Sequence, residues 1–121
     1  VVHRGHSYFA SAAIESLTPN AEIVFLGSCG GYNAISQVLK YSPDAQIISS
    51  KQIGTMLVND RLCLELNEVI RKGNDIVWDK LWTTLDKKFA DGSTADSRFQ
   101  DYIPPHKNLG ALLIKTYRSV L

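Results

Sequence analysis

The sequence predicts a single α/β domain over residues 1–121, in which helices cover both faces of a mainly parallel sheet in a three-layer α/β/α architecture. Short runs of strand-forming residues alternate along the chain with stretches of helical periodicity, and this alternation is typical of βαβ units. The run at residues 22–26 is almost continuously apolar, as expected of a parallel strand covered on both faces. Hydrophobic residues make up 45% and charged residues 21%, which is the composition of an ordinary globular domain.

Three strands and two connecting helices are expected in the first half of the chain. Val1-Val2-His3 is typical of the end of a strand, and residues 22–26 and 45–50 form the other two strands. Helical spacing predicts helices over 8–17 and 32–41, each ended by a turn that contains proline. Three strands are few for a sheet covered on both faces. We therefore expect either that further strands come from an upstream segment or another polypeptide, or that this is only the C-terminal part of a larger domain.

The second half is predicted to be mainly helical. A long helix is expected over 55–72, and a second over 76–89 with Asp75 as its N-cap. A polar loop over 90–98 then leads to a last helix over 107–119. The side chains expected to face the core from these three helices are Leu62, Leu66, Val69, Ile70, Val77, Trp78, Leu81, Trp82, Leu85, Leu109, Leu112, Leu113 and Tyr117.

Charge and cysteine usage exclude several classes of partner. Thirteen Lys and Arg against twelve Asp and Glu leave a formal charge of +1. A nucleic-acid binder needs a concentrated basic face, and the sequence shows none, so we expect no nucleic-acid partner. No apolar run approaches the roughly 20 residues that cross a membrane, and we expect no membrane partner. Two cysteines do not make a disulfide framework. Cys63 lies in an apolar helical pattern and is expected to be a small buried hydrophobe.

Cys29 lies in a different setting, the segment Gly27-Ser28-Cys29-Gly30-Gly31, where a strand turns directly into a helix. If the strand ending near His3 is its parallel neighbour, about 4.8 Å away, the following loops bring His6 and Cys29 to the same sheet edge. A helix N-terminus favours a thiolate, and a nearby imidazole would complete a thiolate–imidazolium pair. Backbone N–H groups of Gly5 or Gly30 would hold a developing oxyanion. These features together predict acyl transfer.

Two other interpretations of Cys29 stay open at this point. Free cysteines are commonly buried, and this one would then be a structural thiol at a tight turn. Together with His3 and His6 it would form a zinc site, although a fourth ligand is not evident. The glycine-rich turn has neither the dinucleotide-binding spacing nor the lysine of a P-loop.

Two segments, Val1-Val2-His3-Arg4-Gly5-His6-Ser7 and Ile23-Val24-Phe25-Leu26-Gly27-Ser28-Cys29-Gly30-Gly31, resemble the caspase-like (clan CD) cysteine peptidases. The second segment is similar to the separase and bacterial caspase-like versions, and the resemblance covers roughly residues 1–90. It implies Cys29 as nucleophile and His6 as catalytic histidine, with His3 as the alternate. Ser7 stands where the family usually has glycine after that histidine.

The same resemblance has consequences for ligands. It implies a peptide or protein substrate and no metal or organic cofactor, and it places Ser50, Lys51 and Gln52 along the primary specificity pocket. The competing hypothesis is a non-catalytic pseudo-peptidase, or another α/β binding module, in which Cys29 is structural. An incomplete sheet leaves an edge that another chain covers, so we also expect either a homodimer or association with a missing N-terminal segment.

Overall fold

The computed structural model describes residues 1–120 and contains a four-stranded sheet, in the spatial order β1-β2-β3-β4. The strands are β1 (Val2–His3), β2 (Ile23–Leu26), β3 (Gln46–Ser50) and β4 (Tyr102–Ile103). The first three are parallel, whereas β4 runs antiparallel to β3. The predicted α/β class and mostly parallel sheet are confirmed. The fourth strand, Tyr102–Ile103, lies between the predicted loop and the predicted last helix, where no strand was expected.

Strand register brings the ends of the first three strands to one edge. His3 of β1 is paired with Leu26 of β2, and Leu26 with Ser49 of β3. The His3 carbonyl accepts a hydrogen bond from the Gly27 N–H at 2.9 Å, so the pairing continues beyond the last residue of β2. The connections that follow these strands therefore leave the sheet side by side.

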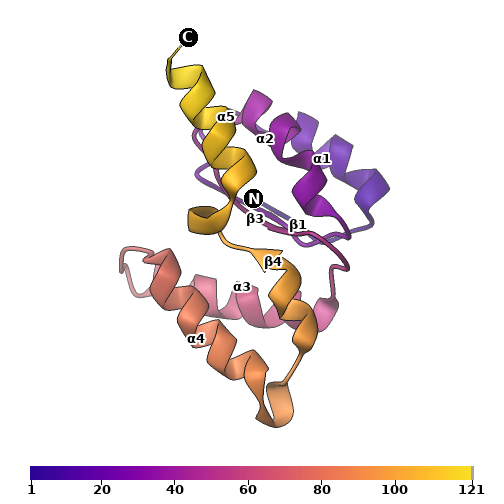
Figure 1. The fold of residues 1–121 in the computed structure, drawn as a ribbon, viewed down its shortest axis with the longest axis vertical. Helices are drawn as coiled ribbons and strands as arrows, with labels where there is room; N and C mark the ends of the chain where they lie inside the picture. The colour runs from indigo at the N-terminus through magenta and orange to yellow at the C-terminus, as the bar shows by residue number, and fades with distance from the viewer. Residues whose placement is uncertain (121) are drawn as a thin grey trace.

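Within residues 1–120, five α-helices accompany the sheet: α1 (Ala10–Glu15), α2 (Ile35–Tyr41), α3 (Met56–Arg71), α4 (Trp78–Ala90) and α5 (Leu109–Ser119). Short 3₁₀ turns precede three of them, namely η1 (Ser7–Phe9), η2 (Gly31–Ala34) and η5 (Pro105–Lys107). Two more, η3 (Gly92–Thr94) and η4 (Ser97–Asp101), occupy the segment predicted as a polar loop. In Figure 1, α1, α2 and α5 lie on one side of the strands and α3 and α4 on the other.

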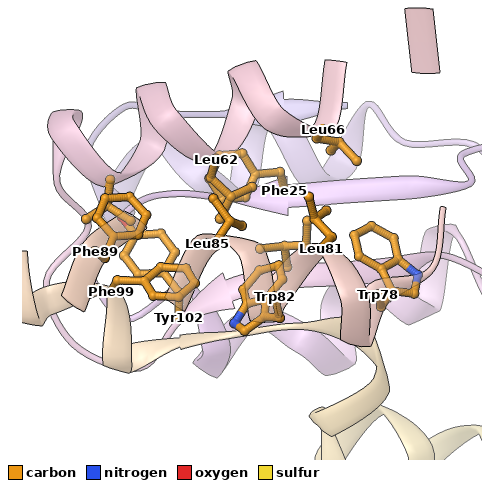
Figure 2. Packing of buried hydrophobic residues seen from close by; sticks show 12 residues of the cluster. Phe25, Leu62, Leu66, Trp78, Leu81, Trp82, Leu85, Phe89, Phe99 and Tyr102 are labelled. Atoms are coloured by element: carbon orange, nitrogen blue, oxygen red, sulfur yellow. The ribbon is translucent and has the colours of Figure 1, made fainter. Parts of the chain in front are cut away.

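Two hydrophobic clusters fill the space between helices and sheet. Side chains of α3, α4, η4 and β4 pack on Phe25 and Ile48, and Figure 2 shows Phe89, Phe99 and Tyr102 grouped at one end of this cluster. The predicted core positions of Trp78 and Trp82 are confirmed. The second cluster joins α1, α2 and α5 to Val24, Leu26 and Ile47. Alternate residues of β2 thus enter opposite clusters, as the strand pleat requires.

Several helical predictions need correction. Helix α4 starts at Trp78, and its N-cap is Val77 with no side-chain cap bond, not Asp75. The side chains of Ile70 and Val77 are exposed rather than inward. So are all four core positions predicted for the last helix: Leu109, Leu112, Leu113 and Tyr117. Helix α5 instead packs through Ala111 and Ile114, because a different stripe of the helix faces the second cluster.

Cys63 is half-buried rather than enclosed, although it does pack against the first cluster. Among residues 1–120, no helix is long and apolar enough to cross a membrane.

Candidate functional site

The Cys29 side chain is exposed. Cys29 follows Gly27 by two residues, and the Gly27 N–H donates the hydrogen bond to the His3 carbonyl. Gly30, the next residue, has a φ of 65°, a left-handed conformation that glycine adopts without strain. The chain then forms η2, and α2 begins only at Ile35. The predicted passage from Cys29 directly into an α-helix is therefore wrong. The first residue of α2 lies six positions beyond Cys29 in the sequence.

A buried chain of hydrogen bonds holds the backbone just before Cys29. Asn59 of α3 donates through Nδ2 to the Gly27 carbonyl at 3.0 Å, and its Oδ1 accepts from the Tyr102 hydroxyl at 2.7 Å. That hydroxyl also accepts from the Thr55 N–H at 3.0 Å. Asn59 and Tyr102 are almost fully buried. No sequence signal identified either residue, because each connects elements that are far apart in the chain.

The connection between β3 and α3 presses against the Cys29 loop. A Cβ at Gly54 would stand 1.9 Å from the Gly27 oxygen, so only glycine allows this approach. The Gly30 N–H donates to the Gln52 carbonyl at 2.7 Å. That amide, predicted as an oxyanion donor, thus has its hydrogen engaged in this structure.

His3 and His6 lie in the connection after β1 but in different settings. The His3 ring, half-buried at the strand end, is 3.2 Å from the His6 carbonyl through Nε2, and it folds over Gly5. The His6 ring is exposed and stacks on Tyr8, with ring centroids 5.2 Å apart. Among the described residues, no hydrogen bond joins the His6 ring to the Cys29 sulfur.

The three predicted specificity residues occupy the end of β3 and the following turn. Ser50 is fully buried, and its hydroxyl donates to the Ile53 carbonyl and accepts from the Gln52 N–H, each at 3.3 Å. Ser50 therefore shapes the turn. Lys51 and Gln52 are exposed, and the Lys51 ammonium lies 5.0 Å from the centroid of the Tyr32 ring.

Burial raises the pKa of one thiol and one phenol in the described part of the chain. Burial raises the pKa of the Cys63 thiol above its ordinary value of 9.0, which keeps it protonated near neutrality. Burial also raises the pKa of Tyr102 above 10.0, and a negative charge on Cys29 raises it further.

Two buried hydroxyls lie near this loop without partners: those of Ser28 and Ser49. Ser28 directly precedes Cys29, and Ser49 pairs with Leu26 in the sheet. Across residues 1–120, no group of three or more His, Cys, Asp or Glu side chains is placed to hold a metal ion. His3, His6 and Cys29 are therefore not arranged as the zinc site that their residue types allowed.

The site thus combines an accessible thiol on a loop held by α3 and β4 with an accessible imidazole on the neighbouring loop. Such a pair can perform nucleophilic acyl transfer if the two side chains meet. Comparisons of this chain with protein-family models, with curated proteins and with solved structures gave no match.

Proposed function

We propose that the protein is a cysteine peptidase with a caspase-like, three-layer α/β/α arrangement, in which Cys29 is the nucleophile and His6 its acid–base partner. The observation that carries the proposal is the parallel pairing of β1 with β2, continued by the hydrogen bond from Gly27 to His3. It makes the loops of His6 and Cys29 neighbours at one edge. Helices on both faces of the sheet support the architectural part of the proposal.

The reaction balances without a cofactor. The thiol proton passes to the His6 imidazole, and the sulfur forms a bond to the carbonyl carbon of the scissile peptide. The carbon–nitrogen bond then breaks, and the leaving amine takes the proton from the imidazolium. Water next adds to the thioester, giving up a proton to His6, and the carbon–sulfur bond breaks to release a carboxylic acid and restore the thiol.

The reaction needs donors for the oxyanion and a contact between the His6 ring and the Cys29 sulfur. Among residues 1–120, no atom accepts a hydrogen bond from the backbone N–H of Gly5 or of Cys29, so both amides are free to hold an oxyanion. The His6 ring has to leave Tyr8 and turn toward the sulfur. An exposed side chain makes that rotation at small cost, and catalytic contacts commonly tighten only in the substrate complex.

The test is the rate at which iodoacetamide alkylates Cys29, measured by mass spectrometry across pH 5–9. The reference is an unstructured peptide with a single cysteine, because the half-buried Cys63, whose pKa is raised by burial, would react more slowly than any exposed thiol. We expect Cys29 to react at least about tenfold faster at pH 6 and to lose that advantage in His6→Ala, while His3→Ala keeps most of it. A Cys29 rate equal to that of the reference peptide thiol, and indifferent to His6, would remove the proposal.

A second candidate is a binding module without catalysis. It is favoured by the engaged Gly30 amide and by the stacking of His6 on Tyr8. In addition, β1 is at the edge of the sheet and pairs only with β2 among the described strands, which suits addition of a strand from a partner. The alkylation experiment distinguishes the two functions, because a binding module needs no activated thiol.

A further inference from the structure

Bulky apolar side chains stand exposed in the two connections that flank the Cys29 loop. After β3, Ile53 is 58% exposed and Met56, the first residue of α3, is 69% exposed. After β1, Tyr8 is 71% and Phe9 58% exposed. Large apolar groups left exposed beside a candidate site are groups that a bound partner can cover.

Ile53 is fixed beside the Cys29 loop by contacts on both sides of it. The preceding residue, Gln52, accepts the Gly30 N–H at 2.7 Å, and the following residue, Gly54, packs on Gly27 and Ser28. The exposed side chain of Ile53 thus rises from backbone that touches the segment carrying the nucleophile.

The connection after β1 carries two aromatic side chains next to His6. Tyr8 stacks on the His6 ring with an interplanar angle of 6°, and Phe9 packs on Tyr8 with ring centroids 4.5 Å apart. When His6 turns toward the sulfur, the face of Tyr8 that it now covers becomes free for another apolar group.

Charge in these two connections argues against ionic recognition of the substrate. Residues 4–9 and 51–57 contain no Asp or Glu, so neither connection offers a carboxylate to a basic substrate side chain. Their two permanent cations already have partners. Arg4 forms an ion pair with Asp60, and Lys51 lies over the Tyr32 ring.

We propose that the substrate of Cys29 is a peptide with a bulky apolar side chain on the residue whose carbonyl carbon the sulfur attacks. That side chain packs between Ile53 and Met56, and neighbouring apolar residues of the peptide cover Tyr8 and Phe9. This inference rests on the proposed peptidase function and adds the class of substrate to it.

Peptidyl acyloxymethyl ketones test the inference on the full chain. The thiolate displaces the carboxylate of the probe, so that a carbon–sulfur bond forms, a carbon–oxygen bond breaks and a stable thioether remains on Cys29. Probes differing only in the residue next to the ketone, namely Leu, Ala, Asp and Lys, are compared by the rate of Cys29 labelling. We expect the Leu probe to label at least about tenfold faster than the other three.

Ile53→Ser is the matched variant and Ile70→Ser its control, since Ile70 is 53% exposed on α3 and outside these connections. Ile53→Ser should lower the ratio of Leu-probe to Ala-probe rates by at least about fivefold, whereas Ile70→Ser should leave that ratio unchanged. Fastest labelling by the Asp or Lys probe, or equal rates for all four, would overturn the inference. Loss of His6-dependent alkylation would instead overturn the peptidase function, and the inference with it.

Discussion

Removing the Tyr102 hydroxyl tests whether the buried hydrogen-bond chain stabilises the Cys29 loop. In Tyr102→Phe, the Thr55 N–H loses its acceptor and Asn59 Oδ1 loses its donor, while the aromatic packing against Phe25 and Phe99 is kept. A buried polar group left unpaired costs about 1–3 kcal/mol. With two such groups we expect the free energy of unfolding to fall by about 2–6 kcal/mol.

The measurement is equilibrium unfolding in urea followed by far-ultraviolet circular dichroism, with Tyr117→Phe as control because that ring is exposed on α5. A drop at the lower end of this range lowers the melting temperature by roughly 10 °C in a domain of this length. A change below about 0.5 kcal/mol, the ordinary range for exposed positions, would show that the chain of bonds contributes nothing to stability.

Alkaline pH offers a second readout of the same residue. The pKa of Tyr102 is higher in the folded protein than its ordinary 10.0, because burial disfavours the phenolate. The stability linked to this group is therefore complete below pH 10 and is lost as pH rises through the folded pKa. Tyr102→Phe should remove this part of the alkaline decline. An identical slope in the wild type and the variant would contradict the assignment.

Three further changes have clear expected outcomes in the same unfolding assay. Ser49→Ala should be neutral or stabilising by up to about 1 kcal/mol, because the buried Ser49 hydroxyl has no partner. Ser42→Ala should lose about 1 kcal/mol, because the Ser42 hydroxyl donates to a main-chain carbonyl at 2.6 Å. Equal effects of the two substitutions would refute this expectation. Gly54→Ala should lower the free energy of unfolding by more than about 3 kcal/mol, because the added Cβ would overlap a carbonyl oxygen. Gly73→Asn should be tolerated, because Gly73 has a φ of 72° and open space around it. A stable Gly54→Ala protein would disprove the close approach. Asp96→Ala should cost about 1 kcal/mol at pH 7 through loss of its cap and its pair with Arg98. The Arg98 hydrogen bond lowers the pKa of Asp96 in the folded protein. The contribution of Asp96 to stability is therefore present above pH 3.8 and should vanish as pH falls through the lower pKa of the folded state. A stability difference between wild type and Asp96→Ala that persists in acid would contradict this.

The parallel strands and their shared edge could be predicted from the sequence because they follow from local patterns. The apolar run at Ile23–Leu26 and the helical periodicity between strands leave few alternative topologies. Strand β4 could not be predicted in this way. Two residues before a proline carry no period, and Tyr102–Ile103 becomes a strand only by pairing with Ser49 and Ser50.

The role of Asn59 in holding the Cys29 loop could not be predicted either, because it depends on tertiary packing. Asn59 is a polar residue in a helix that is otherwise amphipathic, and nothing local distinguishes it from a solvated one. Only the packing of α3 against β2 buries it and brings its amide to Gly27. In the same way, apolar spacing in the last helix predicted a core face at Leu109 and Leu113, whereas the contact made by α5 selects Ala111.

The two sides of the candidate site are attached to the fold with unequal strength, and this determines how activity would be lost. Asn59 and Gly54 tie the Cys29 loop to buried structure, so changes there also lower the free energy of unfolding. The His6 loop is held by the His3 ring and by the exposed pair of Arg4 with Asp60, a kind of contact worth at most about 1 kcal/mol. Changes on this side therefore displace the imidazole while the domain stays folded. A lower reaction rate of Cys29 can thus arise from changes in either loop. Only changes that disturb the Cys29 loop, which follows β2, also lower the free energy of unfolding.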